Sequence, residues 1–215
     1  MYIINYVQFT PSAERVNFSV RSVVKGHYRV TYRGVPAQKC PFDYVIYQML
    51  INKIKPDLII EIGTNNGGGC LYMADLLDIL GKGIIHTVDI EDKVLDVVRN
   101  HTRIKRFTNG WQGYDVNEAE GYEKVLIIED GSHTYEDTIG ALKKLAHLVT
   151  VDSYLIVEDG IVSKLGVKGE FNGGPLKAIR EFLLENKNFQ NDTEYSDMFG
   201  KNATFNVNGY LKKVK

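Results

Sequence analysis

The stretch LIIEIGTNNGGG, at residues 58–69, decides the fold of this chain. Its first six residues form an almost continuous apolar run, which is typical of a strand buried on both faces of a parallel sheet. The glycines that follow allow the backbone to turn tightly. The stretch therefore predicts a buried strand over 58–63, a glycine-rich turn, and a helix over 67–80 that packs inward through Leu71, Ala74, Leu77 and Leu80.

The same alternation of strand and helix patterns continues on both sides of this stretch. A helix is predicted from Pro41 until Pro56 ends it, with Val45, Ile46, Met49, Leu50 and Ile54 at helical spacing. Further helices are predicted near 94–99, 135–148 and 175–186, and further strands over 83–90, 104–110, 124–130, 153–160, 189–193 and 203–214.

This alternation predicts an α/β fold with a mostly parallel, seven-stranded, doubly wound sheet. The last strand, near the turn Asn208-Gly209, is expected to pair antiparallel at the sheet edge. The layout resembles the Rossmann-like class I methyltransferase fold.

The length of 215 residues fits one domain with a small addition. We assign residues 36–215 to that domain. Residues 1–35 are rich in aromatic and β-branched residues, with Gly26 and Gly34 as breaks. They are interpreted as an N-terminal extension of irregular or short-strand structure that packs on the core.

The bulk composition favours a cytoplasmic protein. A net charge of −1 gives no field that would attract nucleic acid or an anionic membrane, and the chain lacks a long basic stripe for RNA. Cys40 and Cys70 are too few for a disulfide framework and suggest a reducing compartment. We expect no membrane span and no signal peptide. The sequence leaves homo-oligomer formation open.

Two acidic pairs end two of the predicted strands: Glu129-Asp130 and Glu158-Asp159, with His133 just behind the first. Carboxyl ends of strands face the ligand crevice of an open α/β sheet. Asp130, Glu158 and Asp159 offer hard oxygen ligands that suit Mg²⁺, and His133 can serve as a general base. The alternative is that these acids are solvated strand ends that cap the helices following them.

The other side of the predicted crevice suits a nucleoside. Asp89 ends the second strand, where an acid can bind a ribose diol, or it can cap the next helix. Trp111, after Gly110, can stack on adenine or cover the core. S-adenosylmethionine fits better than a dinucleotide, because its cationic sulfonium suits a mouth lined by acids. The predicted cofactor residues are Glu61, Gly63, Thr64, Asn65, Gly68, Asp89, Gly110, Trp111 and Asp130.

Several stretches together resemble the cephalosporin hydroxylase / rhamnosyl O-methyltransferase family. They are Gly34–Gln38, KPDLIIEIGTNNGGG (55–69), IIEDGSHTYE (127–136), YLIVEDG (154–160), GGPLKAIREFL (173–183) and NVNGYLKKV (206–214).

The resemblance implies S-adenosylmethionine and Mg²⁺ as cofactors and a sugar hydroxyl of a glycan, glycolipid or natural product as the acceptor. It also implies Asp130, Glu158 and Asp159 as metal ligands, with His133 as the base. Glu61, Gly63 and Asp89 would contact the cofactor, and Asp130 would belong to both the cofactor site and the catalytic pair with His133.

Other functions remain open at this point. The acceptor could be a small molecule without a sugar. The chain could be a hydroxylase, although an iron oxygenase usually takes two histidines and one carboxylate, and this crevice offers one histidine. A non-catalytic partner protein is a third alternative. The glycine-containing loop 161–174 is either a lid over the acceptor or a plain connector.

Overall fold

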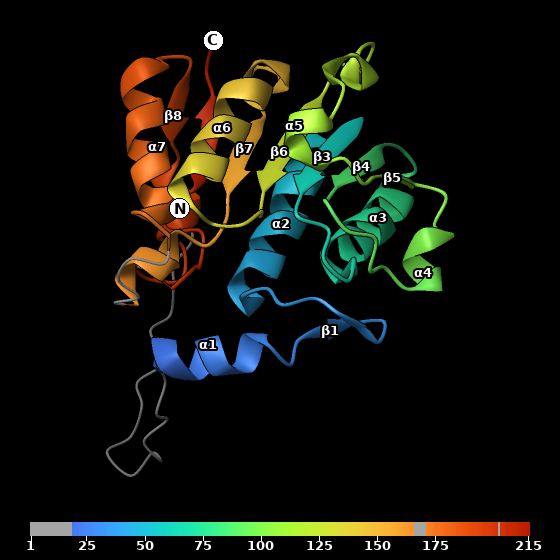
Figure 1. The fold of residues 1–215 in the computed structure, drawn as a ribbon, viewed down its shortest axis with the longest axis horizontal. Helices are drawn as coiled ribbons and strands as arrows, with labels where there is room; N and C mark the ends of the chain where they lie inside the picture. The colour runs from blue at the N-terminus through green and yellow to red at the C-terminus, as the bar shows by residue number, and fades with distance from the viewer. Residues whose placement is uncertain (1–18, 166–170, 202) are drawn as a thin grey trace, which may run out of the picture.

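The fold, seen in a computed structural model that describes residues 19–165, 171–201 and 203–215, is built on one seven-stranded sheet (Figure 1). Across the sheet the strands are β5 (Ile104–Phe107), β4 (Ile84–Val88), β3 (Leu58–Ile62), β6 (Val125–Glu129), β7 (Tyr154–Val157), β9 (Tyr210–Lys213) and β8 (Phe189–Asn191). The pairs from β5 to β7 are parallel, whereas β9 is antiparallel to both of its neighbours. The predicted α/β class and the mostly parallel, seven-stranded sheet are confirmed.

One expectation about the sheet was wrong. The last strand, β9, does not lie at the edge but enters between β7 and β8. The turn that precedes β9 brings Tyr210 opposite Ile156 of β7, and Asn191 of β8 pairs with Leu211 on the other side. Tyr210 and Leu211 are fully buried there, between the two neighbouring strands.

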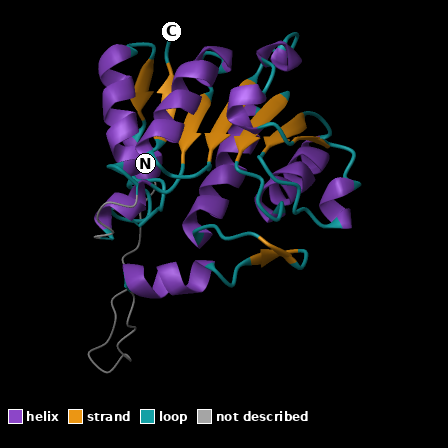
Figure 2. Cartoon of the chain, in the orientation of Figure 1, coloured by secondary structure: helices purple, strands orange, loops and turns teal. Residues whose placement is uncertain are grey.

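Helices cover both faces of the sheet, as the doubly wound prediction requires (Figure 2). Leu58 and Ile60 of β3 pack with the cluster that includes α6 and α7, whereas Ile59 between them packs with α2 and α3 on the opposite face. The helices are α2 (Pro41–Ile54), α3 (Gly68–Leu80), α4 (Asp96–Arg99), α5 (Gly110–Gly113), α6 (Tyr135–Leu145), α7 (Gly174–Glu185) and α8 (Thr193–Ser196). Single 3₁₀ turns are η1 (Val116–Ala119), η2 (Ala146–Leu148) and η3 (Gly160–Lys164).

The described part of the predicted extension contains the short strands expected, but it also contains a helix that was not expected. It begins with helix α1 (Val20–His27). A capping box, in which Ser19 and Ser22 bind each other's backbone N–H groups, stabilises the start of this helix. A short hairpin of β1 (Thr31–Tyr32) and β2 (Val35–Pro36) follows. Residues 1–18 lie outside the described structure. None of the helices in the described ranges is long and apolar enough to cross a membrane.

Helix α2 buries three of the five residues that the spacing predicted to face inward, Ile46, Leu50 and Ile54. Val45 and Met49 are 43% and 37% exposed, while Asp43 and Tyr47 are buried. Apolar periodicity therefore located the buried face of α2 only in part, because that face also contains polar residues. The polar residues on that face bind the chain that leads into β9.

The predicted strand over 203–214 is also shorter than expected, because only its end forms β9. Before it, the backbone N–H of Phe205 donates to Asp43 at 3.1 Å, and the side-chain amide of Asn206 donates to the Tyr47 hydroxyl at 3.1 Å. These residues bind side chains of α2 instead of a neighbouring strand. The third predicted strand, 104–110, likewise ends at Phe107, and Gly110 starts α5.

Candidate active site

The carboxyl ends of β3, β6 and β7 are held in register at the site. The backbone N–H of Asp130 donates to the carbonyl of Ile62, and that of Glu158 donates to the carbonyl of Glu129, each at 2.8 Å. Gly63 makes the close approach possible: its φ is +95°, and a Cβ there would lie 1.9 Å from the Asp130 carbonyl oxygen. Any side chain at this position would push apart the strand ends that carry the site.

One cavity of about 670 Å³ brings both predicted halves of the crevice together, a size typical of small-molecule sites. The predicted residues that line it are Gly63, Asn65, Asp89, Gly110, Trp111, Asp130, His133 and Asp159. A recess of about 40 Å³ is lined by the remaining cofactor residues, Glu61, Thr64 and Gly68, and shares Gly63, Asn65 and Asp130 with the cavity. Glu158 lines neither space and is 4% exposed.

Neutral groups satisfy the acids on the cofactor side. One oxygen of Asp89 accepts from the backbone N–H of Asn65 at 2.8 Å, and the other accepts from that of Ile90 at 2.7 Å. Glu61 is buried and accepts from the Thr87 hydroxyl at 2.5 Å. Burial raises the pKa of Glu61 to about 8. Asp89 therefore ties the end of β4 to the glycine turn after β3, and it caps no helix.

Trp111 both lines the cavity and covers part of the core. Its indole lines the cavity and also packs against α6, where a Cβ on Gly140 would lie 2.4 Å from the ring. One edge of the ring is thus fixed by the core. The part that reaches the cavity is held in place and can present a flat apolar surface to a ligand.

The two acidic pairs have the same internal arrangement. In each pair the glutamate is buried, with Glu129 2% and Glu158 4% exposed. The aspartates are more open: the side chains of Asp130 and Asp159 are 22% and 26% exposed, and both line the cavity. Glu129 also lines the cavity, whereas Glu158 does not. Burial, together with the neighbouring carboxylates, raises the pKa of Asp130, Glu158 and Asp159.

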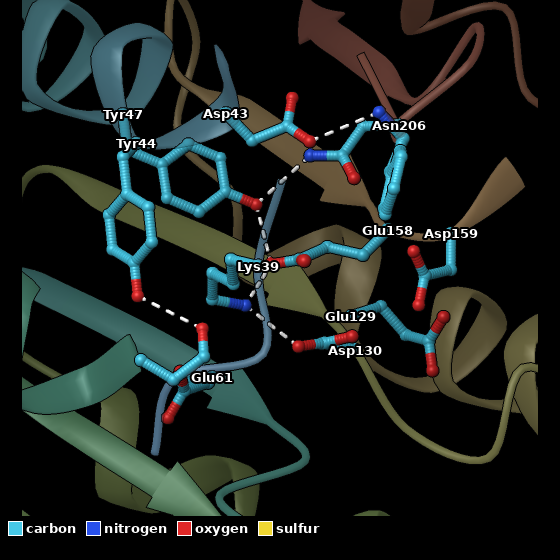
Figure 3. A network of polar contacts seen from close by, with 12 residues as sticks. Lys39, Asp43, Tyr44, Tyr47, Glu61, Glu129, Asp130, Glu158, Asp159 and Asn206 are labelled. Carbon is cyan, nitrogen blue, oxygen red and sulfur yellow. Dashed lines mark hydrogen bonds and ion pairs between the residues drawn. The ribbon is translucent and has the colours of Figure 1, made fainter. Parts of the chain in front are cut away.

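A lysine that sequence reasoning missed lies inside this acidic group (Figure 3). The Nζ atom of Lys39 is 2.7 Å from Asp130 Oδ2 and 2.6 Å from Glu158 Oε1, and the residue is 5% exposed. Burial disfavours its charge, but the charges of Asp130, Glu158 and Glu61 outweigh that effect and raise the pKa of Lys39. The ammonium therefore supplies positive charge that carboxylates at this density require.

Glu158 is also held from behind by α2. The Tyr47 hydroxyl donates to the same Oε1 atom at 2.5 Å, and the side-chain amide of Asn206 donates to that hydroxyl (Figure 3). Asn206 also donates to Tyr210, whose hydroxyl donates to Asp43 at 2.8 Å. A buried chain of polar side chains thus connects the carboxylate of Glu158 to α2 and β9.

The imidazole of His133 faces Asp159, with 3.2 Å between Nε2 and Oδ2. Its other nitrogen, Nδ1, is buried and has no hydrogen-bond partner among the described atoms. Burial disfavours the imidazolium, but the charges of Asp159 and Asp130 outweigh it and raise the pKa of His133. Both His133 (φ 58°) and Asp159 (φ 54°) have left-handed backbone conformations, which is uncommon for such residues and frequent at functional sites.

The donor set at this point fits a hard divalent cation. Asp130, His133 and Asp159 each offer a ligand atom, and these atoms lie within 4.8 Å of one another. Two carboxylates with open second oxygens suit Mg²⁺. Glu158, predicted as a third ligand, is held by Lys39 and Tyr47 through Oε1, so only Oε2 is free of those bonds.

A second group of the same composition, Asp75, Asp78 and His101, meets the same distance limit on the surface. There, however, Arg33 binds Asp75 and Arg103 binds Asp78. These two arginines already balance the acids, so this group is an ordinary ion-pair network. The comparison shows that the spacing of the ligand atoms alone does not identify a metal site.

The residues missed from the sequence left little signal in it. Lys39 directly follows the family-like stretch that ends at Gln38. A single lysine before a helix matches no motif that would indicate a function. Asn206 starts the family-like ending, which offered the only hint. His27, from α1, also lines the cavity. Its Nδ1 atom contacts the Val24 carbonyl oxygen at 2.5 Å, and His27 is not part of the described ligand group.

Known proteins of one family resemble this chain over most of its length. The family profile described as Rhamnosyl O-methyltransferase/CmcI matches residues 24–214. The rhamnosyl O-methyltransferase of Mycobacterium bovis is 28% identical over 202 residues, covering 85% of this chain and 78% of that protein. That of Mycobacterium leprae is 27% identical over 199 residues, covering 84% and 82%.

Solved structures agree with the fold. A CmcI structure with SAH has a TM-score of 0.68 at 18% identity, covering 99% of this chain and 96% of that one. A CmcI structure designated Mg-SAM has a TM-score of 0.66 at 21% identity, covering 99% and 88%. The Rossmann-like methyltransferase fold and the resemblance stated from the sequence are thereby confirmed. The family profile spans most of the chain, and the protein belongs to the rhamnosyl O-methyltransferase/CmcI family.

Proposed function

We propose that this protein is an S-adenosylmethionine- and Mg²⁺-dependent O-methyltransferase that methylates a sugar hydroxyl of a glycan, glycolipid or natural product. One observation carries the proposal: the glycine turn and Asp89 line the same cavity as Asp130, His133 and Asp159. The names of the relatives, rhamnosyl O-methyltransferases, support the sugar acceptor, and the Mg-SAM structure of CmcI supports both cofactors.

The order of the strands assigns the two reactants to opposite ends of the cavity. Asp89 and Gly63 follow β4 and β3, so we place the cofactor there. Asp130 and Asp159 follow the next two strands, β6 and β7. Beyond them the cavity wall is largely apolar, and we assign it to the acceptor. That wall consists of Val24, Tyr28, Ile161, Val162, Leu165, Phe171 and Phe205. It suits an acceptor that presents one apolar face.

When bound, S-adenosylmethionine would supply the methyl group, and Mg²⁺ on Asp130, Asp159 and Glu158 would lower the pKa of an acceptor hydroxyl. His133 would take the hydroxyl proton. The new O–CH₃ bond would form as the S–CH₃ bond breaks, giving a methyl ether and S-adenosylhomocysteine. In the structure the charges of Asp159 and Asp130 raise the pKa of His133, an effect that a cation bound to these acids would offset.

The proposal is tested by transfer of a labelled methyl group from S-adenosylmethionine to a panel of deoxysugar glycosides, with Mg²⁺ or with excess chelator. We expect a labelled methyl ether with Mg²⁺ and loss of product in chelator, restored by excess Mg²⁺. Asp78→Asn is a matched control, because it removes an acid from the surface group of the same composition. Transfer that is unaffected by chelator would contradict the metal dependence, and no transfer to any glycoside would contradict the acceptor class.

A further inference from the structure

Lys39 lies where a metal would be expected to act on the acids. Its ammonium contacts Asp130 and Glu158, two of the three proposed ligands, at 2.7 Å and 2.6 Å. It comes from the segment between β2 and α2, far in sequence from both acids. The Tyr44 hydroxyl fixes that segment by donating to the Ala37 carbonyl at 3.0 Å. The position of Lys39 is therefore set by the fold.

The fold also makes room for the lysine stem. A Cβ on Gly69, in the first turn of α3, would lie 2.7 Å from Lys39 Cε and 3.0 Å from Glu61 Oε1. The absence of a side chain at Gly69 leaves the space that the stem fills. The Tyr47 ring, whose centroid is 5.8 Å from Nζ, adds a favourable contact for the cation.

The ammonium and a divalent cation would need the same carboxylates. Lys39 uses Oδ2 of Asp130 and Oε1 of Glu158, and Tyr47 uses the latter atom as well. Two cations on the same carboxylates repel each other strongly in a buried site. The adjoining recess offers the ammonium another place, because Lys39 and the acid Glu61 both line it.

We propose that Lys39 is an internal counter-cation that competes with the divalent metal for Asp130 and Glu158, so that metal binding displaces its ammonium toward the recess beside Glu61. This inference rests on the proposed metal dependence. Lys39 is thus a positioning residue: it holds the two carboxylates together without the metal and weakens metal binding by competing for them.

Mn²⁺ binding, counted by electron paramagnetic resonance of the free ion, tests the competition without any turnover. The wild-type protein is compared with Lys39→Met and with Lys93→Met, which removes an exposed lysine from the rim of the same cavity. We expect Lys39→Met to bind Mn²⁺ about tenfold more tightly or better. Lys93→Met should change the affinity less than about twofold, because solvent screens its charge. Asp159→Asn should lose the site.

Unchanged or weaker Mn²⁺ binding by Lys39→Met, with the site intact in the wild type, would overturn the competition and leave the proposed function standing. Mn²⁺ binding to neither protein would remove the metal from the proposed function, and this inference with it. A second measurement avoids dependence on the folding of Lys39→Met. In wild-type protein with ¹³Cε-labelled lysine, Mg²⁺ should shift the Lys39 resonance, assigned with Lys39→Arg. A metal-saturated protein with an unshifted Lys39 resonance would also overturn the proposal.

Discussion

The two halves of the cavity hold acids of the same kind at the same edge of one sheet, but they balance them differently. On the cofactor side, Asp89 accepts from backbone N–H groups, and Glu61 accepts from a threonine hydroxyl. On the acidic side, Asp130 and Glu158 are paired with the ammonium of Lys39, and Asp159 faces His133. Hydrogen bonds from neutral groups hold the acids of the first half, whereas contacts with charged residues hold those of the second. The charge of Lys39 also acts on Glu61.

This difference predicts two kinds of behaviour. The hydrogen bonds of Asp89 come from a turn that the fold makes in any case, so the cofactor half should be formed before any ligand binds. The acidic half is a balance of charges in which each member depends on the others, since a buried charge without its partner is costly. Cations and charge-changing substitutions should therefore act on the acidic half. They should reach the cofactor half only at Glu61, which lines the same recess as Lys39, and should leave the contacts of Asp89 nearly unaffected.

The largest expected effect comes from removing a charge that the proposed metal needs. Asp159→Asn should lower kcat about 10³-fold or more and should abolish the response to Mg²⁺, because a Lewis acid supplies several kcal/mol. Methyl-transfer rates over a range of Mg²⁺ concentrations measure this. Activity that excess Mg²⁺ still stimulates in the variant would show that Asp159 is not a ligand.

His133→Ala should lower kcat about 10²-fold or more, the usual contribution of a general base. Because His133 lies in the acidic half, the affinity for S-adenosylmethionine should stay within about twofold of the wild type. Single-turnover rates and cofactor titrations separate the two quantities. An equal loss of cofactor affinity would indicate that the histidine holds the structure together.

Asp89→Ala tests the cofactor half of the cavity. It removes an acceptor for the Asn65 N–H and the proposed partner of the ribose, so we expect cofactor affinity to fall about tenfold, as for one charged hydrogen bond. Saturating cofactor should restore most of kcat. Metal affinity should not change. A variant with weakened Mn²⁺ binding would show that the two halves are not independent.

The smallest expected effect concerns Asp43, in the polar network behind Glu158. Burial raises the pKa of Asp43 from 3.8 to about 7. A raised pKa favours the protonated form in the folded protein. The stability contributed by this group is therefore complete below about pH 4 and is lost as the pH rises through 7.

Asp43→Asn should remove that pH dependence, because the amide keeps the shape and cannot ionise. Relative to the wild type, the Tm of the variant should rise by a few °C between pH 5 and pH 8, since about 1 kcal/mol corresponds to a few degrees in a domain of this size. Thermal unfolding at several pH values gives the comparison. Parallel Tm curves for the two proteins would contradict an ionisable Asp43.

The sheet and the cofactor half could be predicted because their signals are local. Residues 58–69 carry an apolar strand followed by glycines, and Asp89 lies directly after the next strand. The insertion of β9 between β7 and β8 could not be predicted, because the sequence of a short apolar strand does not indicate which strands it pairs with. The polar part of the inward face of α2 could not be predicted either, because Asp43 and Tyr47 interrupt the apolar pattern.

The acids of the second half were located from the sequence, but their balance was not. Carboxylates at the ends of adjacent strands need positive charge nearby. From the sequence, a metal ion was the only cation that we assigned to this place. Lys39 lies 91 residues from Asp130 and 119 from Glu158 in sequence, and no spacing rule joins them. The roles of all these residues remain predictions.

The most direct test is calorimetry on the wild-type protein and Asp159→Asn. S-adenosylmethionine is titrated with and without Mg²⁺, and Mg²⁺ is titrated separately. We expect both proteins to bind the cofactor with the same micromolar affinity. Only the wild type should show a Mg²⁺ binding heat. No cofactor binding under either condition would contradict the proposed function. Cofactor binding lost in Asp159→Asn would contradict the division of the cavity into two independent halves.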